Sequence, residues 1–147
     1  MTHVLSFPGF RVLASTHWED LSEAGQTCFT LGDPKHGVGA LQFSTALYRS
    51  GAAPHISLSG LRRMREDFER SRRLEEPFDL IEKVEPLMAV VGSYHYGGDF
   101  LRVWFVSDGL NAILATYVCA WPDRDVEADE CLRIVGSIQF VSDKQVS

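Results

Sequence analysis

One short stretch of the chain gathers most of the side-chain types that could bind or catalyse. It contains a histidine, an aspartate, an arginine and three aromatic residues: Tyr94, His95, Tyr96, Asp99, Arg102 and Trp104. In an enzyme, His95 would be the general base and Asp99 the carboxylate that orients it across a hairpin. In a binding protein, tyrosine, tryptophan and arginine are the types that contribute most to interface affinity. A third interpretation is ordinary sheet packing with a polar edge, since aromatic cross-strand pairs stabilise sheets.

The binding interpretation assigns a partner surface to five of these residues. They are Tyr94, Tyr96, Asp99, Arg102 and Trp104. Along the strand predicted for Phe100–Val106, alternate residues point to opposite faces. If Leu101 faces the core, Arg102 and Trp104 lie on the other face, beside part of the Tyr94–Asp99 segment. An open face would make them a partner surface, whereas a covered face would make Trp104 a core residue.

Sequence motifs for catalysis or for cofactor and metal binding are not found. The chain has no phosphate-binding loop, and Gly37-Val38-Gly39 lacks the third glycine and the strand-to-helix context of a dinucleotide site. A nucleophile elbow is also missing, and the five histidines are too scattered for a two-histidine metal motif. We therefore assign no catalytic residue, no cofactor and no metal, although distant residues can still assemble a catalytic site.

Composition and charge narrow the classes of partner. The 147 residues, of which 45% are hydrophobic, suffice for one domain with a core. The net charge of −6 disfavours general nucleic-acid binding, which normally leaves a basic footprint. Residues 77–147 hold 11 acids against five bases, which suits a basic protein partner, although solubility explains this balance equally well.

No segment predicts a membrane span or a secretion signal. The longest uncharged apolar stretches, such as Ile113–Trp121, fall short of the roughly 20 residues that a spanning helix needs. The start, Met1–Val4, lacks a basic region followed by a long apolar run, so we expect a cytoplasmic protein. Three cysteines without a C-x-x-C pair argue against a disulfide framework and a zinc site, so we expect reduced thiols that mainly pack.

The elements that must position these residues are strands and two helices. In the first half, apolar runs predict strands at Val4–Phe7, Phe10–Ala14, Cys28–Leu31 and Gly39–Tyr48. Ser57 is placed to cap a helix that runs to about Leu74. Its apolar stripe is Leu58, Leu61, Met64 and Phe68, and arginines and acids are interleaved at the other positions, which is typical of a solvated face.

The second half predicts an antiparallel meander followed by a helix. Three strands, Leu87–His95, Phe100–Val106 and Asn111–Ala120, are joined by the turn signals Gly97-Gly98 and Ser107-Asp108-Gly109. A final helix is predicted to begin at Pro122-Asp123, with acids in its first turns and Phe140 anchoring its end. Its apolar face is Val126, Cys131, Ile134, Val135 and Ile138.

This order of elements resembles the PsbP-like sandwich domains, a group that includes DcrB-like proteins. The resemblance rests on the turn at Ser107–Gly109, the Thr116-Tyr117 strand and the ending Ile134-Val135 to Phe140, and it covers mainly the last 60 residues or so. It implies an α+β fold in which an antiparallel sheet is flanked by helices on both faces. It also implies binding of other proteins, and it supplies no catalytic residues.

Two functions of different class follow. The first is a single, non-catalytic protein-binding domain, such as a bacterial adaptor or an immunity protein that neutralises a toxin. The alternative is a small-molecule carrier or small enzyme with a pocket between helix and sheet, and with His95 or Cys119 at its mouth. A deep, closed pocket with converging polar groups would favour the carrier or enzyme, whereas a flat exposed aromatic patch would favour the protein binder.

Overall fold

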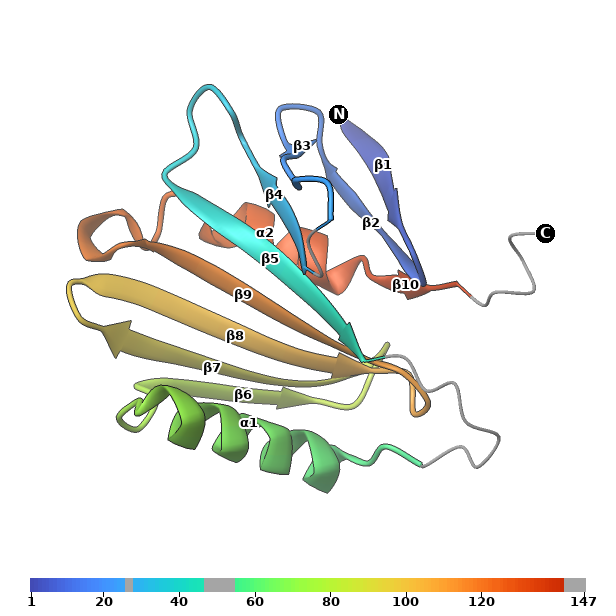
Figure 1. The fold of residues 1–147 in the computed structure, drawn as a ribbon, viewed down its shortest axis with the longest axis vertical. Helices are drawn as coiled ribbons and strands as arrows, with labels where there is room; N and C mark the ends of the chain where they lie inside the picture. Colours follow the sequence, from blue (N-terminus) through green and yellow to red (C-terminus); the bar gives the residue numbers. More distant parts are fainter. Residues whose placement is uncertain (26–27, 47–54, 142–147) are drawn as a thin grey trace.

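Antiparallel pairing organises the chain. The computed structural model describes residues 1–25, 28–46 and 55–141, and in them the strands form two sheets with orders β3-β4-β5-β9-β8-β7-β6 and β1-β2-β10 (Figure 1). The strands are β1 (Thr2–Phe7), β2 (Phe10–Ser15), β3 (Glu19–Asp20), β4 (Cys28–Gly32), β5 (Gly39–Ala46), β6 (Asp79–Lys83), β7 (Met88–Tyr96), β8 (Asp99–Ser107), β9 (Ala112–Ala120) and β10 (Gln139–Phe140). The helices are α1 (Leu58–Arg72) and α2 (Ala128–Gly136), and a 3-10 turn spans Trp121–Asp123. The prediction of an α+β fold built on antiparallel strands is confirmed.

The predicted meander forms the centre of the large sheet. Strands β7, β8 and β9 pair in sequence, and one glycine in each of their turns, Gly97 and Gly109, has the positive φ angle that the turn needs. The four strands predicted in the first half correspond to β1, β2, β4 and β5. The last two residues predicted for β5, Leu47 and Tyr48, lie outside the described part of the chain.

Helix α1 begins where the sequence predicts. The hydroxyl of Ser57 accepts a hydrogen bond from the Gly60 amide at 3.2 Å, which satisfies one of the free amides of the first turn. Leu61 and Phe68 are buried, and the Phe68 ring meets Phe105 edge-to-face. The predicted apolar stripe is therefore correct at these two positions, while Met64 is half-buried.

Helix α2 is shorter than the sequence predicts. The segment after Pro122 forms a 3-10 turn, and the α-helix begins only at Ala128. Val126, which the sequence pattern places on the apolar face, is 64% exposed. Cys131, Ile134, Val135 and Ile138 are buried as predicted, but the chain leaves the helix at Ser137, so Phe140 belongs to β10.

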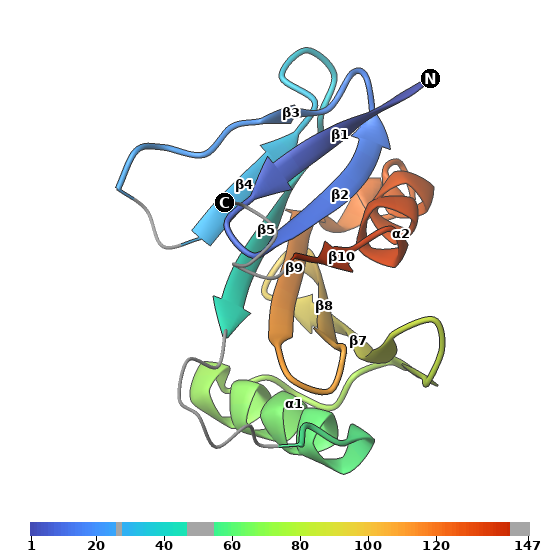
Figure 2. The ribbon, with the colours of Figure 1, turned by 90° about the vertical axis from the view of Figure 1, so that its right-hand side faces the viewer.

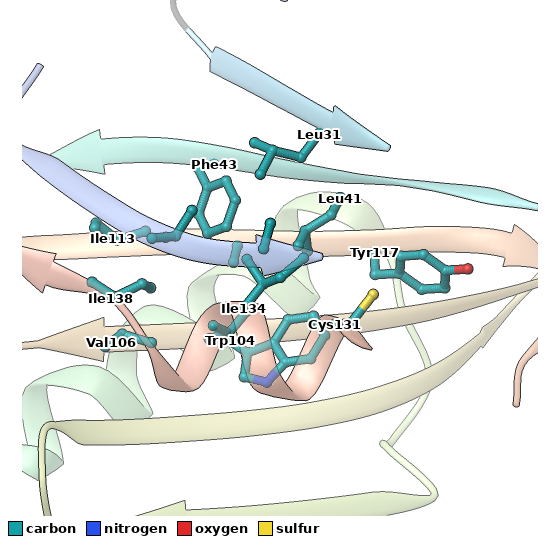
Figure 3. Packing of buried hydrophobic residues seen from close by; sticks show 14 of the residues in the cluster. Leu31, Leu41, Phe43, Trp104, Val106, Ile113, Tyr117, Cys131, Ile134 and Ile138 are labelled. Carbon is teal, nitrogen blue, oxygen red and sulfur yellow. The ribbon is translucent and has the colours of Figure 1, made fainter. Parts of the chain in front are cut away.

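Strand β8 contributes alternate side chains to two hydrophobic clusters. Leu101, Val103 and Phe105 pack in the cluster that contains Leu61 and Phe68 of α1. The intervening Trp104 and Val106 pack in a second, larger cluster, which contains the buried residues of α2 and Phe10 and Val12 of β2. Figure 3 shows Trp104 and Val106 beside Cys131, Ile134 and Ile138 in this second cluster. Both faces of β8 are therefore buried.

The small sheet and α2 lie next to each other (Figure 2). The amide of Leu13 in β2 donates to the hydroxyl of Ser137, and the amide of Ser15 donates to a carboxylate oxygen of Glu130. Strand β10 then pairs with β2 through Gln139 and Phe140. The chain ends that are described thus hold each other across more than 120 residues of sequence.

A buried carboxylate fixes the start of α2. Glu127 is 7% exposed, and its Oε1 accepts a hydrogen bond from the Tyr117 hydroxyl at 2.7 Å and from the amides of Val38 and Gly39 at 3.2 and 3.1 Å. Burial and this hydrogen bond raise the pKa of Tyr117 above its usual value. A side chain at Gly39 would collide with the Tyr117 hydroxyl, so the glycine makes room for the bond.

Candidate functional site

A groove lies between α2 and the edge of the large sheet. The volume of its cavity is about 220 Å³. The lining is mainly apolar and comes from β6, β7, β8, α2 and the segment between β6 and β7: Ile81, Lys83, Glu85, Pro86, Leu87, Ala89, Val91, Arg102, Trp104, Val106, Leu132, Val135 and Gly136. We call this the α2 groove.

Strand register explains why these residues meet. Ile81 pairs with Val91, and Val91 pairs with Trp104, so the three side chains form a row on one face of the sheet. Trp104 is buried beneath the groove, and Ile81 at the sheet edge is 43% exposed. On the opposite wall, Leu132 of α2 is 52% exposed. The groove is thus an apolar channel with a buried floor and two half-exposed apolar walls.

Arg102 lines one part of the groove, in a position that its neighbours fix. Its Nε donates to the hydroxyl of Ser93 at 2.9 Å, and its guanidinium lies 5.2 and 6.0 Å from the ring centres of Phe100 and Trp104. One terminal nitrogen is 3.9 Å from a carboxylate oxygen of Asp79. This distance permits attraction but is too long for a hydrogen bond.

An aromatic cluster adjoins Arg102 on the same face. The His95 ring stacks on Trp121 with ring centres 3.7 Å apart, and Phe78 meets Trp121 edge-to-face at 5.6 Å. The Arg124 guanidinium lies 4.4 Å from the centre of the Trp121 ring. Phe78 is 51% exposed, so this cluster extends the apolar surface of the groove past Arg102.

The structure divides the predicted partner-binding residues between two faces of the sheet. Arg102 and Trp104 lie on the groove face, as the alternation predicts. Tyr94 pairs with Leu101, and Tyr96 pairs with Asp99. The predicted residues Tyr94, Tyr96 and Asp99 therefore point to the other face. The expectation that all five form one surface is therefore not met.

Two of the five predicted residues are also inaccessible. Tyr94 is 1% exposed, and its hydroxyl donates to Glu69 of α1 at 2.6 Å, while Glu69 also pairs with Arg65. Burial and the contact with Glu69 raise the pKa of Tyr94 above its usual value. Trp104 is 2% exposed and reaches only the floor of the groove. Tyr94 is therefore an anchor for α1, and Trp104 is a core residue.

The pair His95 and Asp99 does not form the catalytic arrangement that the sequence left open. His95 pairs with Phe100, the neighbour of Asp99, so the two side chains point to opposite faces of the hairpin. His95 stacks on Trp121 instead. Strand geometry thus separates the proposed base from its orienting carboxylate.

The buried cysteines behave as packing residues. Cys119 and Cys131 are buried, and loss of solvation raises the pKa of each thiol, so neither is poised as a thiolate. Neither lines the groove. Within the described ranges, no cluster of three or more His, Cys, Asp or Glu side chains could hold a metal ion. Among the same residues, no helix is long and apolar enough to cross a bilayer.

Sequence comparison gives no relative. No protein-family model matches the chain, and no curated protein matches it. Comparison with solved structures gives clear matches. The solution structure of cyanobacterial PsbP (CyanoP) from Synechocystis sp. PCC 6803 matches with a TM-score of 0.62 and 11% identity over 95% of this chain and 92% of that one.

The Ran-binding protein Mog1p of Saccharomyces cerevisiae matches with a TM-score of 0.63 and 6% identity over 98% of this chain and 97% of that one. The chain has the fold that PsbP and Mog1p share. A crystal structure from Bacteroides thetaiotaomicron also matches, with a TM-score of 0.59 and 12% identity over 92% of this chain. The chain spans 46% of the length of that protein. The PsbP-like resemblance is confirmed for the fold.

The sequence predicts a pocket between helix and sheet only as the alternative, and it does not predict which residues line the α2 groove, because these come from separate parts of the chain. Residues 79–83 were not predicted as a strand, although Leu80-Ile81 between charged residues has the composition of a short edge strand. The opposite wall depends on Leu132, which lies on the exposed side of α2. A sequence shows that such side chains are apolar, but their meeting depends on how the helix packs on the sheet.

Proposed function

We propose that the chain is a non-catalytic protein-binding domain that holds an apolar segment of a partner protein in the α2 groove. The observation that carries this proposal is the groove itself, with Ile81 and Leu132 exposed on either side of a buried apolar floor. Paired exposed apolar walls of this kind typically mark an interaction site. The aromatic cluster with Phe78 extends the same surface and adds residue types found at interface hot spots.

The size of the groove favours an anchor side chain over a whole small molecule. Pockets for drug-sized ligands usually have volumes of about 300 to 1,000 Å³ and enclose most of the ligand. A cavity of about 150 Å³ accepts benzene, so the α2 groove at about 220 Å³ has room for one aromatic or two aliphatic side chains. Because the groove is open to solvent, the rest of a partner segment can lie outside it.

We infer that α1 and α2 cover opposite faces of the large sheet. The inference is supported by β8, whose alternate residues pack in the separate clusters of the two helices. In this arrangement α2 covers the sheet around β8 and leaves the groove face of β6 open. The partner segment would complete the cover over Ile81 and Val91.

The fold agrees with a binding role, because Mog1p is a Ran-binding protein. A bacterial adaptor and an immunity protein both act by holding a segment of another protein, so the groove suits either role. For both we propose a cytoplasmic location. The alternative, a small-molecule carrier, is favoured by the mainly apolar lining together with the single arginine in the groove.

Two adjacent residues on β6 provide a matched test. Ile81 and Leu80 are 43% and 46% exposed, but only Ile81 lines the groove, and Leu80 points to the other face. We expect the immobilised Ile81→Asp variant to retain about tenfold less partner protein, or less still, from an extract of the cells that make this chain. Leu80→Asp should change the retained amount less than about twofold. The comparison is made by quantitative mass spectrometry of proteins retained from host extract, with thermal melting of both variants as the stability control.

Other outcomes would contradict the proposal. Equal losses in the two variants would show that the partner does not use the groove. A stoichiometric small molecule, seen by native mass spectrometry in the wild-type protein and absent from Ile81→Asp, would favour the carrier instead.

A further inference from the structure

We infer that the α2 groove recognises a partner segment in which a carboxylate lies next to the apolar anchor, and that Arg102 binds this carboxylate. The inference rests on the proposed function and specifies the chemistry of the partner. An apolar groove alone accepts any apolar side chain. A fixed cation in its lining adds a second requirement, which is that the partner segment carries a nearby negative charge. Arg102 is this cation.

Arg102 is held in place with its outer nitrogens unused. Within the described residues, its one hydrogen bond runs from Nε to Ser93, and the two terminal nitrogens donate to no acceptor. The bond to Ser93 and the flanking rings of Phe100 and Trp104 restrict the side chain, which is 23% exposed. A restricted guanidinium loses less freedom when it binds than a mobile one does.

Asp79 is the acid nearest to Arg102, and it leaves the guanidinium available. Its carboxylate lies 3.9 Å away and is 45% exposed, so water solvates it and no hydrogen bond closes the pair. A partner carboxylate placed over the groove could accept two parallel hydrogen bonds from the terminal nitrogens, which is the geometry that arginine favours. The apolar side chains nearby exclude water and strengthen such a bond.

The remaining charges of the groove support an acidic contact segment. The lining contains two cations, Lys83 and Arg102, against one acid, Glu85. Arg124, stacked on Trp121, adds a third cation to the adjoining aromatic cluster. The acidic balance of the whole chain suggests a basic partner, but here three cations stand against two acids, Glu85 and the half-exposed Asp79, which leaves an excess of one positive charge. We therefore expect an acidic residue within the contact segment, whatever the net charge of the partner.

Selection from phage-displayed random dodecapeptides tests the inference with no need to identify the partner first. The wild-type protein is expected to enrich peptides that carry aspartate or glutamate at a fixed spacing from a large apolar residue. Arg102→Gln is expected to enrich the apolar residue without the acid. Arg70→Gln serves as the matched control, because Arg70 is an exposed arginine that pairs with Asp67 within α1 and does not line the groove.

The best selected peptide is then compared with its amide version, in which glutamine or asparagine replaces the acid. With wild-type protein, the amide is expected to bind about tenfold more weakly by fluorescence anisotropy, and with Arg102→Gln the two peptides should differ by less than about twofold. Enriched apolar anchors without an acid would overturn the inference and leave the proposed function standing. Selected peptides that Ile81→Asp binds as well as wild type does, or no enrichment at all, would overturn both.

Discussion

Replacing Trp104 with alanine is expected to lower the free energy of unfolding by roughly 3 to 5 kcal/mol, the usual cost of removing a buried tryptophan from a core. Trp104 is 2% exposed and packs among side chains of α2 in the larger cluster (Figure 3). Removal of its ring leaves a cavity between sheet and helix that neighbours can only partly fill. Chemical denaturation of wild type and Trp104→Ala measures the difference.

Trp104→Phe is the matched control, because it keeps an aromatic ring and should lose clearly less stability. A loss below about 1 kcal/mol for Trp104→Ala would mean that the face beneath α2 is open, and it would restore Trp104 as a direct partner contact. A large loss instead means that binding cannot be tested separately from folding at Trp104.

Glu127→Ala is expected to destabilise the protein by about 3 kcal/mol, because one buried and two partly buried donors lose their acceptor, and a buried donor left without one costs roughly 1 to 3 kcal/mol. The change removes the acceptor of the Tyr117 hydroxyl and of the amides of Val38 and Gly39. Thermal and urea denaturation measure the loss. Hydrogen exchange should also show faster exchange at the Val38 and Gly39 amides.

Glu127→Gln separates hydrogen bonding from packing at the same site. Its amide oxygen can accept the same donors, so its loss should be much smaller than that of Glu127→Ala. Equal losses would show that the charge, rather than the acceptor geometry, holds this region together. Wild-type stability in Glu127→Ala would contradict the buried network altogether.

Much of the fold follows from local patterns in the sequence. Ser57 and the spacing of Leu61 and Phe68 predict α1 correctly, because capping and an apolar stripe both depend on neighbouring residues. The β7–β9 meander is likewise predicted by alternation and by its glycine turns. These elements are specified over short stretches of chain.

Elements specified by distant partners could not be predicted in this way. Strand β10 has two residues and exists because it pairs with β2, more than 120 residues earlier. The early start predicted for α2 depends on Pro122 and the acids after it, which are also compatible with the 3-10 turn that forms. Glu127 looks like one more acid near a helix start, and only the packing of β5 and β9 reveals its buried role.

The candidate site shows the same division. Alternation along β8 correctly places Arg102 on the face opposite Leu101. Continued across the turn, the same alternation pairs Tyr96 with Asp99 on the other face and leaves His95 on the groove face. The α2 groove required the edge strand β6 and the exposed side of α2, and neither carries a strong sequence pattern.

Binding of a partner protein in the α2 groove is tested most directly by site-specific photo-crosslinking from the groove wall. Benzoylphenylalanine is placed either at Leu132, on the groove wall, or at Leu110, in the turn between β8 and β9; the two positions are 52% and 50% exposed. We expect a discrete cross-linked protein from position 132, removed by Ile81→Asp, and none from position 110. The same protein cross-linked equally from both positions, or none from position 132, would contradict binding in the α2 groove.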